Sequence, residues 1–298
     1  MTSKKQMHKI EAKWYKKESA GKVICRLCPR MCIIAPENHG FCGVRKNIDG
    51  TLYALSYGHP VAIHIDPIEK KPLKKFLPGT RTFSIGCYGC NLSCVFCQNY
   101  HLSRAFYSED ELCEFIMPEQ LVNTALKQNC ASIAFTYNEP ITWAEYMIDI
   151  AKFAKKSNLA TVMVSNGYLT EAAAKEIFRL IDAANIDMKG FSEDFYHRLT
   201  SASLEPVLNA MKLFFSMGKH LEITNLVIPG ENDSKSMIEN FLDWTAKNLS
   251  MKVPIHFTAY HPDYKYNSAP PTPSETLHSI KSLAEKKGFK NIFLGNIF

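Results

Sequence analysis

From residue 81 onward the sequence alternates between short apolar runs and longer amphipathic stretches, and this alternation constrains the fold most strongly. The runs are apolar throughout, which is typical of strands buried on both faces of a parallel sheet. In one amphipathic stretch, Ile141, Ala144, Ile148 and Ala151 follow the three-and-four spacing of a helix packed on one side. The pattern predicts an α/β fold of six strand–helix units, as an open doubly wound sheet or a whole or partial barrel.

The expected elements follow a simple order, in which each strand is followed by a helix. The strands are predicted at 82–86, 131–136, 160–165, 184–188, 222–228 and 254–259. The helices are predicted at 118–129, 141–157, 170–181, 203–217, 234–249 and 273–287. A further apolar run at 291–295 would add a last strand.

The first 80 residues have a different character. Their short apolar pieces are interrupted by Gly40, Gly43, Gly58 and several prolines, and they show no long helical period. We therefore expect two parts, an irregular cysteine-rich extension at 1–80 and an α/β domain at 81–298.

Four of the ten cysteines lie close together inside this extension. Their spacing is C-x2-C-x3-C-x9-C, which fits a closed structural site for zinc or for an iron–sulfur cluster. The predicted ligands of this metal site are Cys25, Cys28, Cys32 and Cys42. Because such a site seldom exists in an unfolded chain, its metal is expected to stabilise the extension.

Three more cysteines follow the first predicted strand, and both barrels and open α/β sheets bind ligands at that end of their strands. Cys90, Cys94 and Cys97 have the spacing C-x3-C-x2-C, and a zinc site of this kind would need a fourth ligand nearby. A [4Fe–4S] cluster held by three thiolates instead leaves one iron open. The amino and carboxylate groups of S-adenosylmethionine can chelate such an iron, which brings the sulfonium within reach of an electron.

Composition bears on compartment and partners. The sequence contains no run of about 18 apolar residues and no secretory signal, so we expect a cytoplasmic protein with reduced thiols. Cys87, Cys113 and Cys130 are then expected to be ordinary packed residues. The net charge of +6 is spread along the chain, and the seven lysines of the first 22 residues are interpreted as a solvated terminus. Neither a membrane nor a nucleic acid is expected as a partner.

The cysteine loop, with Phe96 before its last cysteine, resembles the radical S-adenosylmethionine (radical SAM) superfamily. The wider string GCNLSCVFCQN is similar to the branch that contains the pyruvate formate-lyase activating enzymes. The resemblance implies a partial (β/α)6 TIM-like barrel with a [4Fe–4S] cluster at the three cysteines. It also implies reductive cleavage of S-adenosylmethionine to a 5′-deoxyadenosyl radical, with electrons from a donor such as flavodoxin or ferredoxin.

Polar residues at the next two strand ends also resemble that family. Glu139 matches the acid of its Gly-Gly-Glu segment, although Tyr137 and Asn138 replace the glycines. The match implies a charge-assisted hydrogen bond to the cofactor's amino group, and the alternative is an exposed acid at a helix N-terminus. Ser165 and Asn166 match a polar pair near the cofactor's carboxylate and ribose.

Asp187 and Lys189 resemble the Asp-x-Lys segment of the activating enzymes. The match implies that Asp187 contacts the cofactor and that Lys189 acts nearer the substrate, with a surface ion pair as the alternative. His261, after the sixth strand, matches a histidine near the active site of those enzymes, and a structural role is its alternative.

From residue 20 onward the chain resembles the AmmeMemoRadiSam-type radical enzymes, on segments that include LCPRMC, PIEKKPL, NIDMKG and TNLVIPGEND. That resemblance implies a Memo-like or AMMECR1-like partner. The substrate is not indicated and is either a protein glycine, as for an activase of glycyl-radical enzymes, or a small molecule. The competing hypothesis is a non-catalytic scaffold protein whose metal sites are structural.

Overall fold

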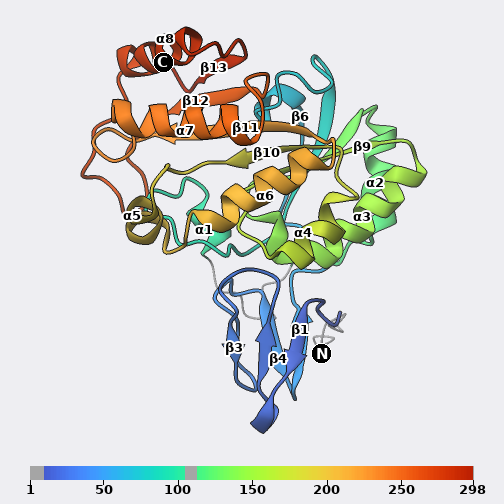
Figure 1. The fold of residues 1–298 in the computed structure, drawn as a ribbon. Helices are drawn as coiled ribbons and strands as arrows, with labels where there is room; N and C mark the ends of the chain where they lie inside the picture. The colour runs from blue at the N-terminus through green and yellow to red at the C-terminus, as the bar shows by residue number, and fades with distance from the viewer. Residues whose placement is uncertain (1–9, 105–112, 298) are drawn as a thin grey trace.

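The computed structural model describes residues 10–104 and 113–297, and its centre is one eight-stranded sheet (Figure 1). Seven neighbouring strands are parallel and follow one another in chain order, and an antiparallel strand, β6, lies at one edge. The strands are β6 (Ala62–Pro67), β7 (Arg81–Gly86), β8 (Ser132–Phe135), β9 (Ala160–Ser165), β10 (Ala183–Asp187), β11 (His220–Val227), β12 (Ile255–Ala259) and β13 (Ile292–Gly295). The predicted strands and the partial barrel are confirmed, whereas β6 was not expected.

A helix follows each strand from β7 to β12, and these helices lie along the outer side of the sheet (Figure 1). They are α2 (Pro118–Lys127), α3 (Ala144–Lys156), α4 (Glu171–Phe178), α6 (Glu205–Ser216), α7 (Lys235–Asn248) and α8 (Ser274–Lys286). The shorter elements are α1 (Tyr100–Ser103), the 3-10 turn η4 (Pro140–Trp143), α5 (Glu193–Phe195) and the π-helical turn η5 (Tyr196–Thr200). In α3 the residues Ala144, Ile148 and Ala151 are all buried, as their spacing predicts.

The chain between β6 and β7 packs on the inner side of the sheet. Ile68 and Leu73 from this segment are fully buried against Ala134, Val162 and Ala183, which come from β8, β9 and β10. Small side chains on the inner face leave room there for a length of backbone. Residues 68–76 therefore fill the interior of the barrel.

Polar contacts fix this segment in place. The Asn185 side-chain amide donates to the Pro72 carbonyl at 2.7 Å. The carboxylate of Glu222 accepts the backbone N–H groups of Lys74 and Lys75 at 3.0 and 2.8 Å. It also pairs with His256 at 2.6 Å. One buried acid near the amino-terminal end of β11 thus holds the segment by accepting backbone N–H groups that would otherwise lack a partner.

The extension contains short antiparallel strands where the sequence indicated irregular structure. A three-stranded sheet and a hairpin stand below the barrel, near α1 (Figure 1). The strands are β1 (Tyr15–Lys17), β2 (Val23–Cys25), β3 (Ile33–Ile34), β4 (Arg45–Ile48) and β5 (Thr51–Ala54). The hairpin turns at Asp49 and Gly50, both with positive φ, as a tight two-residue turn requires.

The expected boundary at residue 80 falls between two paired strands. Residues 62–67 of β6 pair antiparallel with residues 81–86 of β7. The central sheet therefore begins at Ala62, and we propose that the two parts meet between residues 55 and 61. The first nine residues, with part of the basic stretch, lie outside the described residues. Across residues 10–104 and 113–297, no helix has the length and apolar character needed to cross a membrane.

Candidate active site

A cavity of about 410 Å³ opens at the carboxyl ends of the parallel strands. Its walls come from the loop after β7 and from the ends of β8 to β12, and residues 70–72 of the interior segment contribute to its lining. The residues that the sequence singled out and that line this cavity are Cys90, Cys94, Cys97, Glu139, Ser165, Asn166, Asp187 and Lys189. The fold therefore brings together side chains that are up to 99 positions apart in the sequence.

The backbone of the cysteine loop is anchored at its start by close packing. Gly89 has φ +91°, and a Cβ atom there would lie 2.7 Å from the Cys42 carbonyl oxygen. The Asn138 side chain accepts the Cys87 N–H at 3.2 Å and donates to the Gly89 carbonyl at 2.8 Å. This use of Asn138 explains why the segment can carry an asparagine where the resemblance would place glycine.

The rest of the loop is held by η5. Ser93 N–H donates to the Thr200 carbonyl at 2.9 Å, and Val95 N–H donates to the Leu199 carbonyl at 3.0 Å. The loop backbone is therefore hydrogen-bonded to Asn138 at its start and to η5 further along. These contacts hold its thiols in a rigid arrangement.

The three thiols of the loop suit a cluster rather than a single ion. Burial raises the pKa of Cys90 well above its ordinary value and that of Cys94 to about 12, so metal binding must displace protons. Among the described residues, no group of three or more His, Cys, Asp or Glu side chains is arranged to hold a metal ion. In a cubane each cysteine binds a different iron, so its thiolates need not converge on one point. The donor set therefore fits a [4Fe–4S] cluster.

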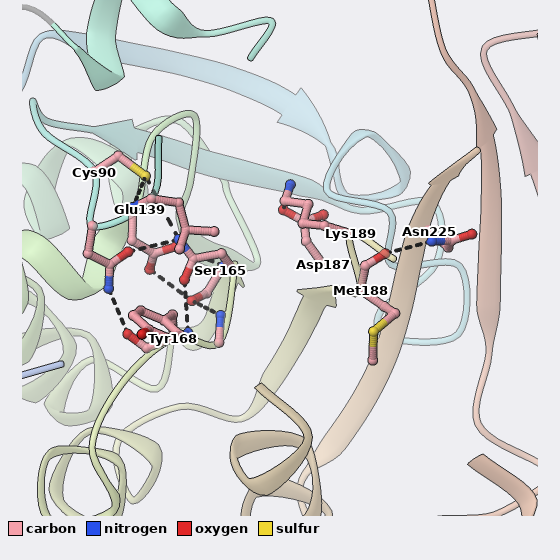
Figure 2. A network of polar contacts seen from close by, with 12 residues as sticks. Cys90, Glu139, Ser165, Tyr168, Asp187, Met188, Lys189 and Asn225 are labelled. Carbon is pink, nitrogen blue, oxygen red and sulfur yellow. Dashed lines mark hydrogen bonds and ion pairs between the residues drawn. The ribbon is translucent and has the colours of Figure 1, made fainter. Parts of the chain in front are cut away.

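Glu139 connects the ends of β8 and β9 (Figure 2). Its side chain is 2% exposed and accepts hydrogen bonds from Ile141 N–H at 3.0 Å, Ser165 Oγ at 2.8 Å and Asn166 N–H at 2.7 Å. It therefore caps η4 while remaining buried in the cavity wall. Of the roughly four lone-pair sites of a carboxylate, about one remains for a ligand.

Burial raises the pKa of Glu139 to about 7, against the opposing effect of these hydrogen bonds. A cation beside it, such as the ammonium group of S-adenosylmethionine, would favour the ionised form.

Asn166 reaches from β9 to the cysteine loop. Its side-chain amide donates to Asn91 Oδ1 at 2.9 Å and lies 3.8 Å from Cys90 Sγ. Its own Oδ1 accepts from Tyr168 N–H at 2.9 Å, and the Asn91 amide donates to the Tyr168 carbonyl at 2.6 Å. Asn91 belongs to the string GCNLSC, but spacing alone gave no indication of this bridging role.

Asp187 and Lys189 lie at the end of β10, apart from the Glu139 group (Figure 2). Lys189 Nζ pairs with Asp187 Oδ2 at 2.9 Å, and both side chains are largely buried. Burial lowers the pKa of Lys189, but the charge of Asp187 and its hydrogen bond with Lys189 hold that pKa above its ordinary value. The pair is therefore a charged couple that faces the cavity rather than a surface ion pair.

His261 lies outside the lining of this cavity. It is exposed and lines a neighbouring cavity of about 170 Å³. Its Nε2 atom contacts Gln98 Nε2 at 3.0 Å, and Gln98 does line the main cavity. His261 is thus at the rim and connects to the site through Gln98, and its catalytic role stays a prediction.

Lysines of the interior segment also line the cavity, a position that their sequence pattern did not indicate. Lys71 is only 4% exposed, pairs with Asp66 at 2.8 Å and lies 4.4 Å from the centre of the Tyr137 ring. Lys70, at the rim, also faces Asp66 at 3.7 Å. These lysines belong to the motif PIEKKPL, which the sequence already marked through its resemblance to a family. Only the fold shows that this segment enters the barrel.

The cysteines of the extension lie directly behind this site. Cys25, Cys28, Cys32 and Cys42 line a separate small cavity together with Asn91 and Thr142 of the barrel. Arg30 donates through Nε to the Asn91 carbonyl and through Nη2 to the Ser201 carbonyl at 2.5 Å. The extension therefore contacts the back of the loop that carries Cys90.

Comparison with known proteins identifies the class that this fold and site define. The family model of the Radical SAM superfamily matches residues 84–244, more than half of the chain, and the chain belongs to that superfamily. Its members are enzymes that use a [4Fe–4S] cluster and S-adenosylmethionine, and this chain is a radical SAM enzyme with sequence similarity to the activating enzymes.

Three known proteins illustrate what the chain is similar to. An uncharacterized protein of Methanocaldococcus jannaschii, MJ0808, is 41% identical over 96% of this chain and 85% of its own length. The pyruvate formate-lyase-activating enzyme of Clostridium pasteurianum is 23% identical over 62% of this chain and 76% of its own length. A radical SAM methyltransferase from Sphaerobacter thermophilus shares the fold at 14% identity and a TM-score of 0.55, over 74% of this chain and 67% of the methyltransferase.

Proposed function

We propose that the main cavity is where this enzyme cleaves S-adenosylmethionine reductively and directs the resulting 5′-deoxyadenosyl radical to a hydrogen atom of its substrate. The observation that carries the proposal is the convergence of Cys90, Cys94 and Cys97 with Glu139 and Asn166 around one cavity. When bound, the [4Fe–4S] cluster supplies an open iron and the electron for this cleavage.

The surrounding residues bind and orient the cofactor. The remaining acceptor site of Glu139 suits the cofactor's ammonium group, and its three protein hydrogen bonds hold the carboxylate in a fixed orientation. Asp187 supplies a second negative charge, and Lys189, its ion-pair partner in the cavity lining, is assigned to the substrate. The buried floor around Lys71 excludes water from one side of the site.

Anaerobic reconstitution of the full chain tests the proposal. The reduced protein is expected to convert S-adenosylmethionine to 5′-deoxyadenosine and methionine, and Cys94→Ala is expected to abolish this conversion. Cys130→Ala is the matched control, because Cys130 lies beyond α2, outside the residues that line the cavity. A Cys94→Ala protein that forms 5′-deoxyadenosine at the wild-type rate would contradict the assignment.

The proposal allows two classes of substrate, a protein glycine or a small molecule. The named relative from Clostridium pasteurianum supports a protein glycine, as for an activase of glycyl-radical enzymes. A glycyl-radical signal in electron paramagnetic resonance, formed on a partner protein, would select that class over a small molecule. A low-potential one-electron donor such as flavodoxin or ferredoxin and a Memo-like or AMMECR1-like partner stay predictions.

A further inference from the structure

The four cysteines of the extension surround a space of their own. Cys25 and Cys28 are buried, Cys32 and Cys42 are partly exposed, and all four line a cavity of about 20 Å³. A volume of about 10–15 Å³ already admits one water-sized sphere, so there is room for atoms other than sulfur beside the thiols.

This arrangement differs from what a closed zinc site requires. In such a site four sulfur atoms converge on one ion, each at about 2.3 Å from it. The described residues contain no group of three or more His, Cys, Asp or Glu side chains arranged to hold a metal ion, and the quartet is no exception. Cys90, Cys94 and Cys97 of the barrel loop are likewise not arranged around a single ion. The family to which the chain belongs binds a [4Fe–4S] cluster.

Arg45 provides a second, independent observation. It is 1% exposed, lines the same cavity and pairs through Nη2 with the buried Glu145. Its Nη1 atom donates to Cys25 Sγ at 3.8 Å and to the Lys13 carbonyl at 3.2 Å. Its Nε atom has no hydrogen-bond partner within the described part of the chain. Because Arg45 lines the cavity of the quartet, an occupant of that cavity can supply an acceptor for this N–H. Glu145 Oε2, a buried acceptor of the same ion pair, also has no partner within the described part of the chain.

We propose that Cys25, Cys28, Cys32 and Cys42 hold a second iron–sulfur cluster, with sulfur atoms that accept hydrogen bonds from Arg45. A cluster spreads its ligands over several irons, so four thiols can bind it without converging on one ion. Arg45 carries a permanent positive charge, which offsets part of the negative charge of four thiolates.

The second cluster lies directly behind the radical site. Asn91, the residue after Cys90, lines the quartet's cavity, and its carbonyl accepts from Arg30 in the chain segment that follows Cys28. The Cys42 carbonyl packs against Gly89 at the start of the same loop. The quartet and the loop of the radical site are therefore in direct contact.

The test uses the full chain with Cys90→Ala, Cys94→Ala and Cys97→Ala combined, isolated without oxygen. This variant lacks the proposed radical cluster, so any remaining iron reports on the quartet alone. We expect iron and acid-labile sulfide in equal amounts, about two to four of each per chain, with a visible charge-transfer absorbance. Zinc without sulfide, iron without sulfide, or no metal at all would overturn the proposal.

A second set of variants assigns the ligands. Adding Cys28→Ser and Cys42→Ser to the same background is expected to remove the remaining iron and sulfide, whereas Cys130→Ser is the matched control and is expected to retain both. Iron and sulfide that persist after loss of Cys28 and Cys42 would contradict the assignment. If the added changes prevent folding, the metal content of the first variant still decides, because its quartet is intact.

Discussion

Asn166 donates one hydrogen bond to Asn91 Oδ1 at 2.9 Å, and the same amide nitrogen lies 3.8 Å from Cys90 Sγ. Asn91 in turn lines the cavity of the extension's cysteines. Two asparagines thus connect the end of β9, the cysteine loop and the extension. A structural change in any one of these three parts is therefore expected to alter the position of the cysteine loop at the radical site.

Glu139→Gln is expected to weaken S-adenosylmethionine binding by about 1.5–3 kcal/mol, because it removes a charge-assisted contact. Burial raises the pKa of Glu139 to about 7, so the wild-type carboxyl group becomes neutral as the pH falls below that value. Affinity should therefore fall from pH 8 to pH 6 in the wild type and change less in the variant. Calorimetric titration of the anaerobic protein measures both effects, and wild-type affinity in the variant would show that the ammonium group binds elsewhere.

Asp187→Asn and Lys189→Met separate the roles of the charged pair. Asp187→Asn should weaken binding of the cofactor by about 1.5–3 kcal/mol, since the sulfonium and ammonium groups lose a nearby negative charge. Lys189→Met should leave cofactor affinity within about threefold of wild type, a difference of less than 1 kcal/mol. Equal losses in the two variants would mean that the pair acts as a single structural unit.

Gly89→Ala tests the contact between the loop and the extension. The new Cβ atom would lie 2.7 Å from the Cys42 carbonyl oxygen and from Val44 Cγ2, at a residue with φ +91°. Gly218→Ala is the matched control, because Gly218 also has positive φ but no atom within 4 Å of the new Cβ. The control should cost about 1–2 kcal/mol of unfolding free energy and Gly89→Ala about 1–3 kcal/mol more, as measured by urea unfolding. Similar losses would indicate that the loop can move away.

Glu222 should make the stability of the barrel sensitive to acid. Burial raises its pKa, but hydrogen bonds from His220, His256 and two backbone N–H groups outweigh this and lower the pKa to about 2, from an ordinary value of 4.5. The carboxylate therefore contributes about 3 kcal/mol above pH 4.5, and this contribution is lost as the pH falls from about 4.5 towards 2. Glu222→Gln should be less stable at pH 7 and should lose less stability between pH 5 and pH 3. A wild-type pH profile in the variant would rule out this role.

The sequence by itself determined the alternating strands and helices and the loop of Cys90, Cys94 and Cys97, because periodicity and spacing are local properties of the chain. Cavity-lining positions for Glu139 and Asp187 followed from the rule that parallel strands present their carboxyl ends on one side. The partial closure of the barrel, by contrast, came only from resemblance until the sheet order was known.

The tertiary structure alone decided what depends on distant partners. Strand β6 forms because β7 offers it an edge, and residues 68–76 enter the barrel because Ala134, Val162 and Ala183 leave space on its inner face. The sequence pattern of residues 62–76 alone indicates neither the pairing of β6 nor the entry of residues 68–76 into the barrel. The same holds for Arg45, whose burial beside the quartet depends on Glu145, a residue 100 positions away. Long-range packing brings such residues together, and no local spacing encodes it.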